Sequence, residues 1–231
     1  AFVEALAPRD TTSSERFQKD YDLAISLGRN ALKKRLRSCG YTLETETAFY
    51  DASDPLQARE RGADLERKNT WLIVGPRRSN HYLLLAQGSP QTPTVSLMAS
   101  SSKVNELGPK HLSLIPLNSE MVRAAVVTIN DRLKKSKNRT FVTVVSKDCE
   151  SCIDFASGFI TEAKKRGLVE TQHFEVAGDA SDLSAIEASV KSSSPGFILL
   201  PNFSKISSQV MSKLAPINAN IFFVGSDGWG D

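Results

Sequence analysis

An α/β fold built from parallel β-sheets is the structure predicted by this sequence of 231 residues. Short apolar runs alternate with amphipathic stretches along the whole chain, which is the pattern of repeated strand–helix units. Several of the apolar runs contain almost no polar residue, as is typical of parallel strands that are covered on both faces. The composition agrees, because 40% hydrophobic and 24% charged residues are ordinary values for a globular protein.

In the first half of the chain, strands and helices alternate regularly. After a strand at 1–7, a helix begins at Glu15 and ends before Gly40, with apolar residues at steps of three and four. The next helix starts at Asp54 and Pro55, a capping residue followed by the residue favoured at the first helical position. Further strands are expected at 41–49, 71–74, 94–98 and 111–117, and helices at 54–68 and 79–87.

The second half repeats the same cycle. Strands are expected at 140–145, 169–176, 197–200 and 221–224, and helices at 119–135, 151–166, 181–191 and 204–214. Each half carries its own strand–helix series, and residues 116–118 lie between the halves, so two sheets are favoured over one. We therefore expect an N-terminal domain at 1–117 and a C-terminal domain at 118–231.

Most signatures of enzymes and of nucleic-acid-binding proteins are missing from the sequence. The net charge is only +3, which gives no argument for a nucleic-acid partner. Neither the glycine-rich nucleotide-binding motifs nor the nucleophile motif of α/β-hydrolases is present. Of the three histidines, His81 is expected in a loop or the first turn of a helix, and His111 and His173 are interpreted as structural. We expect no catalytic residue, no cofactor and no metal, and no run of apolar residues is long enough to span a membrane.

The three cysteines leave two interpretations open. Cys149 and Cys152 form a C-x-x-C pair, and Cys39 is left over. Three cysteines are too few for a four-cysteine zinc site. A local disulfide, or a pair of unreactive thiols in a turn, is favoured over a redox centre at a helix N-terminus.

Loops that follow the predicted strands carry many hydroxyl and basic side chains. In open parallel sheets, ligands bind outside the carboxyl ends of the strands, which is where these loops lie. Each residue alone is typical of a helix cap or a surface charge, whereas the whole set favours a binding cleft. The set comprises Arg9, Thr11, Thr12, Arg77, Arg78, Ser79, Ser100, Ser101, Lys103, Lys147, Ser204 and Lys205. Two short glycosylation sequons, at Asn138 and Asn202, arise often by chance.

Four segments of the sequence resemble motifs of one known family. These are DASDP at 51–55, LIVGPRRS at 72–79, VGSDGW at 224–229 and, more loosely, TVSLMASS at 94–101. In this order and at these spacings they resemble the type I periplasmic binding proteins. The nearest branches are the branched-chain amino-acid-binding proteins and the related extracellular ligand-binding regions of receptors. The resemblance implies a two-lobed α/β fold in which each lobe is a parallel sheet flanked by helices.

The same resemblance implies a set of ligand-binding residues. Ser79 would donate to a carboxylate, the Met98 carbonyl and Ser100 would hold the polar groups of the ligand, and Asp227 would pair with an ammonium group. The ligand-binding residues expected are Arg77, Ser79, Met98, Ser100, Ser101, Ser151, Phe203 and Asp227. An aliphatic amino acid does not need Arg77 or Arg78, so an acidic or multiply anionic ligand is expected to bind better than leucine or valine.

The function implied by the resemblance is non-catalytic. A solute-binding protein of this type is periplasmic or extracellular after its signal peptide is removed. It captures a small polar ligand between two lobes and delivers it to the permease of an ABC transporter. Two alternatives remain: a ligand-sensing or regulatory domain of a receptor or envelope complex, and a thiol-redox enzyme that uses Cys149 and Cys152. Members of the family continue beyond the G-S-D-G turn, so a lobe-completing C-terminal segment is expected to be missing here.

Overall fold

A computed structural model describes residues 2–6, 12–51, 53–177, 182–217 and 221–230. The chain divides into two compact units, each with its own sheet. The first unit comprises Ala1–Met98 with Leu107–Leu114, and the second comprises Ala99–Glu106 with Ile115–Asp231. The loop residues Arg9 and Thr11, which the sequence singled out, lie outside the described residues.

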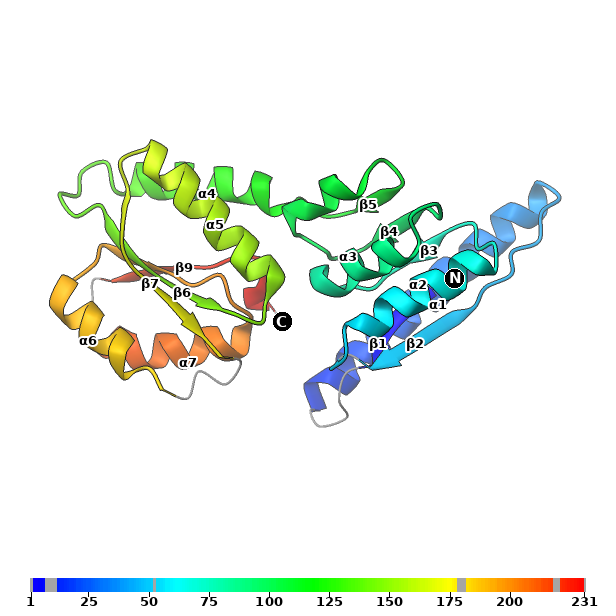
Figure 1. Ribbon diagram of the computed structural model, residues 1–231, viewed down its shortest axis with the longest axis horizontal. Coiled ribbons are helices and arrows are strands. Elements are labelled where there is room, and N and C mark those ends of the chain that lie inside the picture. The colour runs from blue at the N-terminus through cyan, green and yellow to red at the C-terminus, as the bar shows by residue number, and fades with distance from the viewer. Residues whose placement is uncertain (1, 7–11, 52, 178–181, 218–220, 231) are drawn as a thin grey trace. The chain divides into compact units, whose positions relative to one another are not determined.

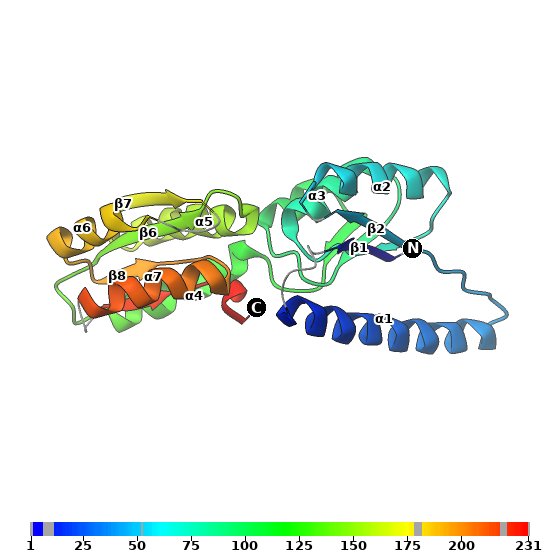
Figure 2. The same ribbon diagram turned by 90° about the horizontal axis from the view of Figure 1, so that it is seen from below.

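A five-stranded parallel sheet forms the centre of the first unit. Its strands are β1 (Phe2–Leu6), β2 (Thr47–Asp51), β3 (Ile73–Val74), β4 (Thr94–Ser96) and β5 (His111–Ser113). They are ordered β2-β1-β3-β4-β5. Its helices are α1 (Thr12–Ser38), α2 (Leu56–Arg67) and α3 (Ser79–Gly88). Helices α2 and α3 cover one face of this sheet, and α1 lies on the other (Figure 2).

Helices α2 and α3 touch through their backbones. A Cβ atom on Gly62 of α2 would collide with the carbonyl oxygen of Leu85 on α3, and one on Gly88 would collide with the carbonyl of Arg59. Only glycine allows this approach, because the obstructing atoms are backbone atoms that cannot rotate away. The apolar side chains beneath the two helices form the core of the unit. They are Tyr50, Ala58, Leu65, Ile73 and Leu85.

Polar side chains are also buried in the first unit. The Tyr82 hydroxyl lies 2.8 Å from the Thr94 hydroxyl, which in turn lies 2.8 Å from Nδ1 of His111. Tyr82 also donates to the carbonyl of Leu112 at 2.9 Å. Burial raises the pKa of Tyr82 and lowers the pKa of His111, so both groups are held in their neutral forms. The network ties α3 to strands β4 and β5.

A four-stranded parallel sheet forms the centre of the second unit. Its strands are β6 (Thr140–Ser146), β7 (Val169–Val176), β8 (Phe197–Leu199) and β9 (Phe222–Val224), ordered β7-β6-β8-β9. Its helices are α4 (Asn118–Arg132), α5 (Glu150–Lys165), α6 (Ser184–Ser193) and α7 (Ser204–Leu214). Helices α4 and α5 cover one face, and α6 and α7 cover the other (Figure 1). Short 3₁₀ helices span Ser102–Leu107, Ala215–Ile217 and Asp227–Gly230.

Strand β6 separates the two apolar cores of the second unit. Successive side chains of a strand point to opposite faces. Phe141 and Val145 therefore pack with α4 and α5, while Val142 and Val144 pack with α6 and α7. On the first face, the Phe141 ring stacks on Phe197 of β8, with centroids 4.9 Å apart. This two-sided burial is what the continuous apolar run at 140–145 predicted.

Several predicted boundaries were wrong. The strand expected at 41–49 is β2 at Thr47–Asp51. The strand expected at 71–74 is reduced to Ile73–Val74, because only these residues pair with β4 and the Trp71 side chain is 88% exposed. Apolar runs reveal burial but not where the hydrogen-bonded ladder stops. Other boundaries differ by two to four residues: α1 begins at Thr12, β4 ends at Ser96, β5 ends at Ser113, α4 ends at Arg132 and α6 begins at Ser184.

Because α2 and α3 approach each other so closely, alanine should have opposite effects on the free energy of unfolding at Gly62 and at Gly28. Gly62→Ala should lower the free energy of unfolding by about 1–3 kcal/mol, because the added methyl group meets rigid backbone. The control is Gly28→Ala in α1, where a Cβ would have nothing within 4 Å. That variant should be more stable by about 0.5–1 kcal/mol, since alanine is the better helix former. Urea unfolding measures the change in the free energy of unfolding of both variants. Equal changes would contradict the close packing of α2 and α3.

Candidate functional site

The turn between β3 and α3 lies at the carboxyl edge of the first sheet. Gly75 has a positive φ of 102° and precedes a cis peptide bond to Pro76. The Gly75 N–H donates to the carbonyl of Val95 at 2.8 Å, and the Ser96 hydroxyl donates to the carbonyl of Pro76 at 2.9 Å. Strand β4 therefore holds the turn from which α3 starts. Sequence reasoning had missed Ser96, because a strand serine has no distinctive pattern.

The N-terminus of α3 combines two features suited to an anion. Ser79 is the first helical residue and is only 6% exposed, and Arg77 is half-buried two residues before it. Arg78 occupies the capping position, and its own side chain makes no capping hydrogen bond. Helix N-termini attract negative charge through their N–H groups and the helix dipole, and the guanidinium adds a full positive charge.

Met98 lies at the same edge of the first sheet. It follows β4, which pairs with β3 in parallel, so the segments after the two strands emerge next to each other. The Met98 N–H donates to the Ser96 hydroxyl at 3.3 Å, and the Met98 side chain is 39% exposed. The structure thus brings Arg77, Ser79 and Met98 to one edge.

His81 anchors the first turn of α3. Its Nδ1 shares a hydrogen bond of 2.7 Å with the hydroxyl of Tyr50 on β2, and both side chains are buried. Burial, and secondly the positive charge of Arg78, lower the pKa of His81 to about 4. His81 is therefore neutral at physiological pH and holds the helix end that carries Ser79.

Ser100 and Ser101 belong to the second unit. They lie in the segment Ala99–Glu106 and are 4% and 0% exposed. The Ser100 carbonyl accepts the N–H of Asn118 at 2.6 Å, and the Ser101 hydroxyl accepts the N–H of Lys103 at 3.3 Å. The position of both serines therefore depends on how this segment is held to the rest of the unit.

The other candidate residues of the second unit share the carboxyl edge of its sheet. Ser151 follows β6, Phe203 follows β8 and Asp227 follows β9, and β8 pairs in parallel with both β6 and β9. Phe203 is 37% exposed and Asp227 is exposed. A Cβ on Gly228 would lie 2.9 Å from Cδ1 of Phe203, so the ring packs against the residue next to Asp227. The Phe203 ring thus lies beside the turn that carries Asp227.

Asn202 holds the loop that presents Phe203. Its Oδ1 accepts the N–H of Ser146 at 2.7 Å, and its Nδ2 donates to the carbonyl of Val144 at 2.8 Å. Asn202 is 0% exposed, so its sequon cannot be read as an accessible glycosylation site. No sequence signal beyond a polar residue after a buried strand indicated this role.

Cys149 and Cys152 form a disulfide at the N-terminus of α5. Cys149 is the N-cap residue, and its sulfur accepts the N–H of Cys152 at 3.3 Å. Both residues are buried in the core under α4 and α5, at 8% and 3% exposure. A redox disulfide must present a sulfur to its partner, so this burial disfavours the thiol-redox hypothesis. Cys39 is free and exposed.

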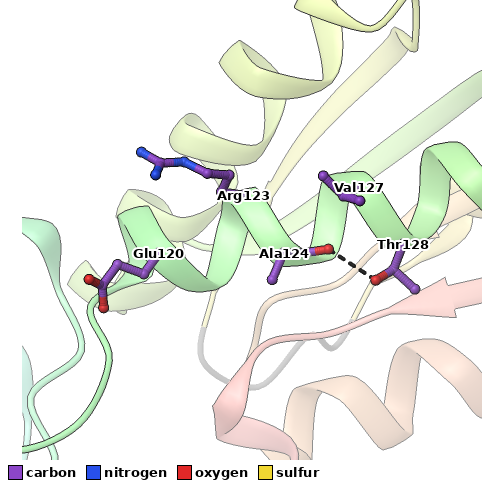
Figure 3. A pocket seen from close by; sticks show the side chains of 5 residues that line it. All are labelled: Glu120, Arg123, Ala124, Val127 and Thr128. Atoms are coloured by element: carbon purple, nitrogen blue, oxygen red, sulfur yellow. Dashed lines mark hydrogen bonds between the residues drawn. The ribbon is translucent and has the colours of Figure 1, made fainter.

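Concavities of about 550, 430 and 340 Å³ in the second unit are lined by residues other than the candidate residues just described. The first of these runs along α4 and is shown in Figure 3. Its charged residues, Glu120 and Arg123, point in different directions, so their charges do not converge on a common point. Among the described residues, no cluster of three or more histidine, cysteine or carboxylate side chains is arranged to hold a metal ion.

Comparison with known proteins reveals the fold. No family model and no curated protein matches the sequence. Among solved structures, a leucine-binding protein of Thermotoga maritima superposes with a TM-score of 0.72 at 15% identity, over 99% of this chain and 64% of that one. An ABC-transporter solute-binding protein of R. palustris in complex with 4-hydroxybenzoate superposes with a TM-score of 0.72 at 15% identity, over 99% of this chain and 62% of that one. A solute-binding protein of an ABC transporter from Rhodopseudomonas palustris BisB5, in complex with 3,4-dihydroxybenzoic acid, superposes with a TM-score of 0.69 at 18% identity, over 100% of this chain and 62% of that one.

The chain has the type I periplasmic binding protein fold. The resemblance of the four sequence motifs is confirmed at the level of the fold, with parallel sheets flanked by helices. The chain spans 62–64% of the length of the three structures named above. None of the described helices is both long enough and apolar enough to cross a membrane.

Because His81 is buried in its neutral form, we predict that the protein loses stability in acid. Between about pH 6.5, the ordinary pKa of histidine, and about pH 4, the unfolded chain binds a proton at this residue that the folded chain does not. The free energy of unfolding should therefore fall by up to about 3 kcal/mol across this interval. His81→Gln should flatten the dependence, leaving the smaller contribution of His111. Urea-unfolding free energies measured against pH for the parent protein and the variant check this, and an unchanged slope in His81→Gln would contradict the prediction.

The two buried hydrogen bonds of Asn202 predict that its substitution lowers the stability of the protein strongly, although the sequence suggests a surface loop at this position. Asn202→Ala should reduce the free energy of unfolding by about 2–4 kcal/mol, because the Ser146 N–H and the Val144 carbonyl lose their buried partners. Lys205→Ala, at an exposed position three residues later, should change it by less than about 0.5 kcal/mol. If chemical denaturation shows equal stability for the two variants, Asn202 does not hold this loop.

Proposed function

We propose that this protein is an extracytoplasmic solute-binding protein that captures a small carboxylate ligand and delivers it to an ABC transporter. The observation that carries the proposal is the first turn of α3, where a buried Ser79 and a half-buried Arg77 flank a helix N-terminus in a type I periplasmic binding protein fold. The solved structures of this fold named above are described as binding leucine, 4-hydroxybenzoate or 3,4-dihydroxybenzoic acid.

An anionic ligand is favoured over an aliphatic amino acid. A helix N-terminus with a serine hydroxyl already suits one carboxylate. Arg77 adds a guanidinium that can hold an anionic group through two parallel hydrogen bonds. In the second unit, the Phe203 ring offers an apolar surface, and Asp227 offers a partner for an amino or hydroxyl group. Acidic amino acids, dicarboxylates and aromatic acids are therefore the proposed ligand classes.

A location outside the cytoplasm is part of the proposal. The Cys149–Cys152 disulfide supports it, because disulfides persist in oxidising compartments such as the periplasm and the extracellular space. The low net charge agrees with a small-molecule partner rather than a nucleic acid.

A thermal-shift panel tests the proposed ligand class. It should include leucine and valine, glutamate and aspartate, succinate, benzoate and 4-hydroxybenzoate. We expect an acid of the proposed classes to raise the melting temperature more than leucine or valine does. For that ligand, Arg77→Ala should raise the Kd about 10–100-fold, the effect of losing a hydrogen bond to a charged group.

The matched control for Arg77 is Arg59→Ala, an exposed arginine of α2 in the same unit. It should leave the Kd unchanged. Stabilisation by aliphatic amino acids alone, with the same Kd in the Arg77→Ala variant, would contradict the anionic ligand and remove Arg77 from the site. Absence of stabilisation by every member of the panel would contradict the proposed function.

A further inference from the structure

Asp154 lies on α5, just after the disulfide, and accepts two hydrogen bonds on one oxygen. Its Oδ2 accepts the backbone N–H of Ser102 at 2.8 Å and the side-chain amide of Asn118 at 2.9 Å. The carboxylate is half-buried and lines a groove of about 340 Å³ between α4 and α5, together with Ser102 and Asn118. None of the sequence motifs included Asp154.

The two groups held by Asp154 come from separate connecting segments. The chain leaves the first unit after Met98, contributes Ala99–Glu106 to the second unit, and returns to the first for Leu107–Leu114. It enters the second unit again at Ile115. Ser102 lies in the first of these segments, and Asn118 starts α4 at the end of the second. A single carboxylate oxygen thus fastens both segments to α5.

Further contacts join the same pieces of chain. The Asn118 amide donates to the carbonyl of Ser151 at 2.8 Å, and the Ser119 N–H donates to the Ser102 hydroxyl at 2.9 Å. Lys103 forms an ion pair of 2.5 Å with Glu150 in the first turn of α5. Asn118 is 1% exposed, and among the described residues its Oδ1 has no hydrogen-bond partner, so the amide is oriented there by its NH₂ group. Asp154 and the Ser151 carbonyl provide that orientation.

We propose that Asp154 is a positioning residue that holds Ser100 and Ser101 in place for ligand binding. The proposal rests on the proposed function and on the expectation, from the motif resemblance, that these two serines contact the ligand. Asp154 acts on them through the backbone: it holds the N–H of Ser102, the next residue, and it holds Asn118, whose own N–H donates to the Ser100 carbonyl. Hydrogen bonds to a charged acceptor are stronger than those between neutral groups, which suits a segment that must not shift.

The carboxylate of Asp154 is not needed for α5 to fold. The helix is held by its apolar face, where Cys152, Phe155, Ala156, Phe159 and Ala163 are buried in the core. Asp154 is not a member of that core. Removing its carboxylate should therefore release the connecting segments and leave the sheet and α5 in place, which makes a local effect distinguishable from a global one.

The test compares Asp154→Ala and Asp154→Asn with Asp131→Ala, an exposed carboxylate of α4 that pairs with Lys134. The full-length protein is used, and amide hydrogen exchange is measured without ligand. In Asp154→Ala, exchange at 99–106 and at 115–119 should rise about tenfold or more, while exchange in β6 and the urea midpoint stay as in the parent protein. Asp154→Asn should be intermediate, because its carbonyl still accepts hydrogen bonds but carries no charge. Asp131→Ala should match the parent.

Binding provides the second measurement, with whichever acid of the panel above stabilises the parent protein. The Kd should rise about tenfold or more in Asp154→Ala and be partly restored in Asp154→Asn. Unchanged exchange at 99–106, a uniform rise across the unit, or faster local exchange with an unchanged Kd would each overturn the positioning role. Failure of every panel acid to bind the parent protein would overturn the proposed function, and the exchange result would still decide whether Asp154 holds the segment.

Discussion

Burial of parallel strands on both faces is the constraint on which the rest of this structure depends. In the second unit, β6 sends Phe141 and Val145 to one core and Val142 and Val144 to the other, so both faces of the sheet require helices. Helices on both faces in turn require the chain to cross from the carboxyl end of one strand to the amino end of the next. Every strand-to-helix turn therefore falls at the same edge of its sheet, and that is where the candidate ligand-binding residues lie.

Strand pairing then decides which of these turns are neighbours. Arg77 and Met98 come together because β3 pairs with β4, although 21 positions separate them in the sequence. Phe203 and Asp227 come together because β8 pairs with β9. The apolar strands supply the geometry, and the polar residues of the turns supply the chemistry. A change in the turns can therefore alter the ligand without altering the fold, which agrees with neighbours of this fold that bind leucine or aromatic acids.

The sequence predicted the fold and the order of its elements, because alternation between two periodicities is a local signal. It failed where an outcome depends on a partner strand: Trp71 is as apolar as a core residue and yet is 88% exposed, since the ladder with β4 begins only at Ile73. Candidate residues at the strand ends were found from the fold rule and from motif resemblance. Ser96, Asp154 and Asn202 were not, because each acts through a hydrogen bond to a residue distant in sequence, and no periodicity or spacing records such a bond.

Those distant hydrogen bonds share one physical logic. His81 is tied to Tyr50, Asn202 to the backbone of β6, and Asp154 to Ser102 and Asn118. In each case a buried or half-buried polar side chain fixes a segment that carries a candidate ligand-binding residue: the first turn of α3 with Ser79, the loop with Phe203, and the segment with Ser100 and Ser101. Apolar packing alone tolerates small shifts, whereas a buried polar group loses free energy as soon as its partner moves. Polar anchors beneath the turns are thus how an apolar α/β scaffold obtains the precision that binding a small ligand demands.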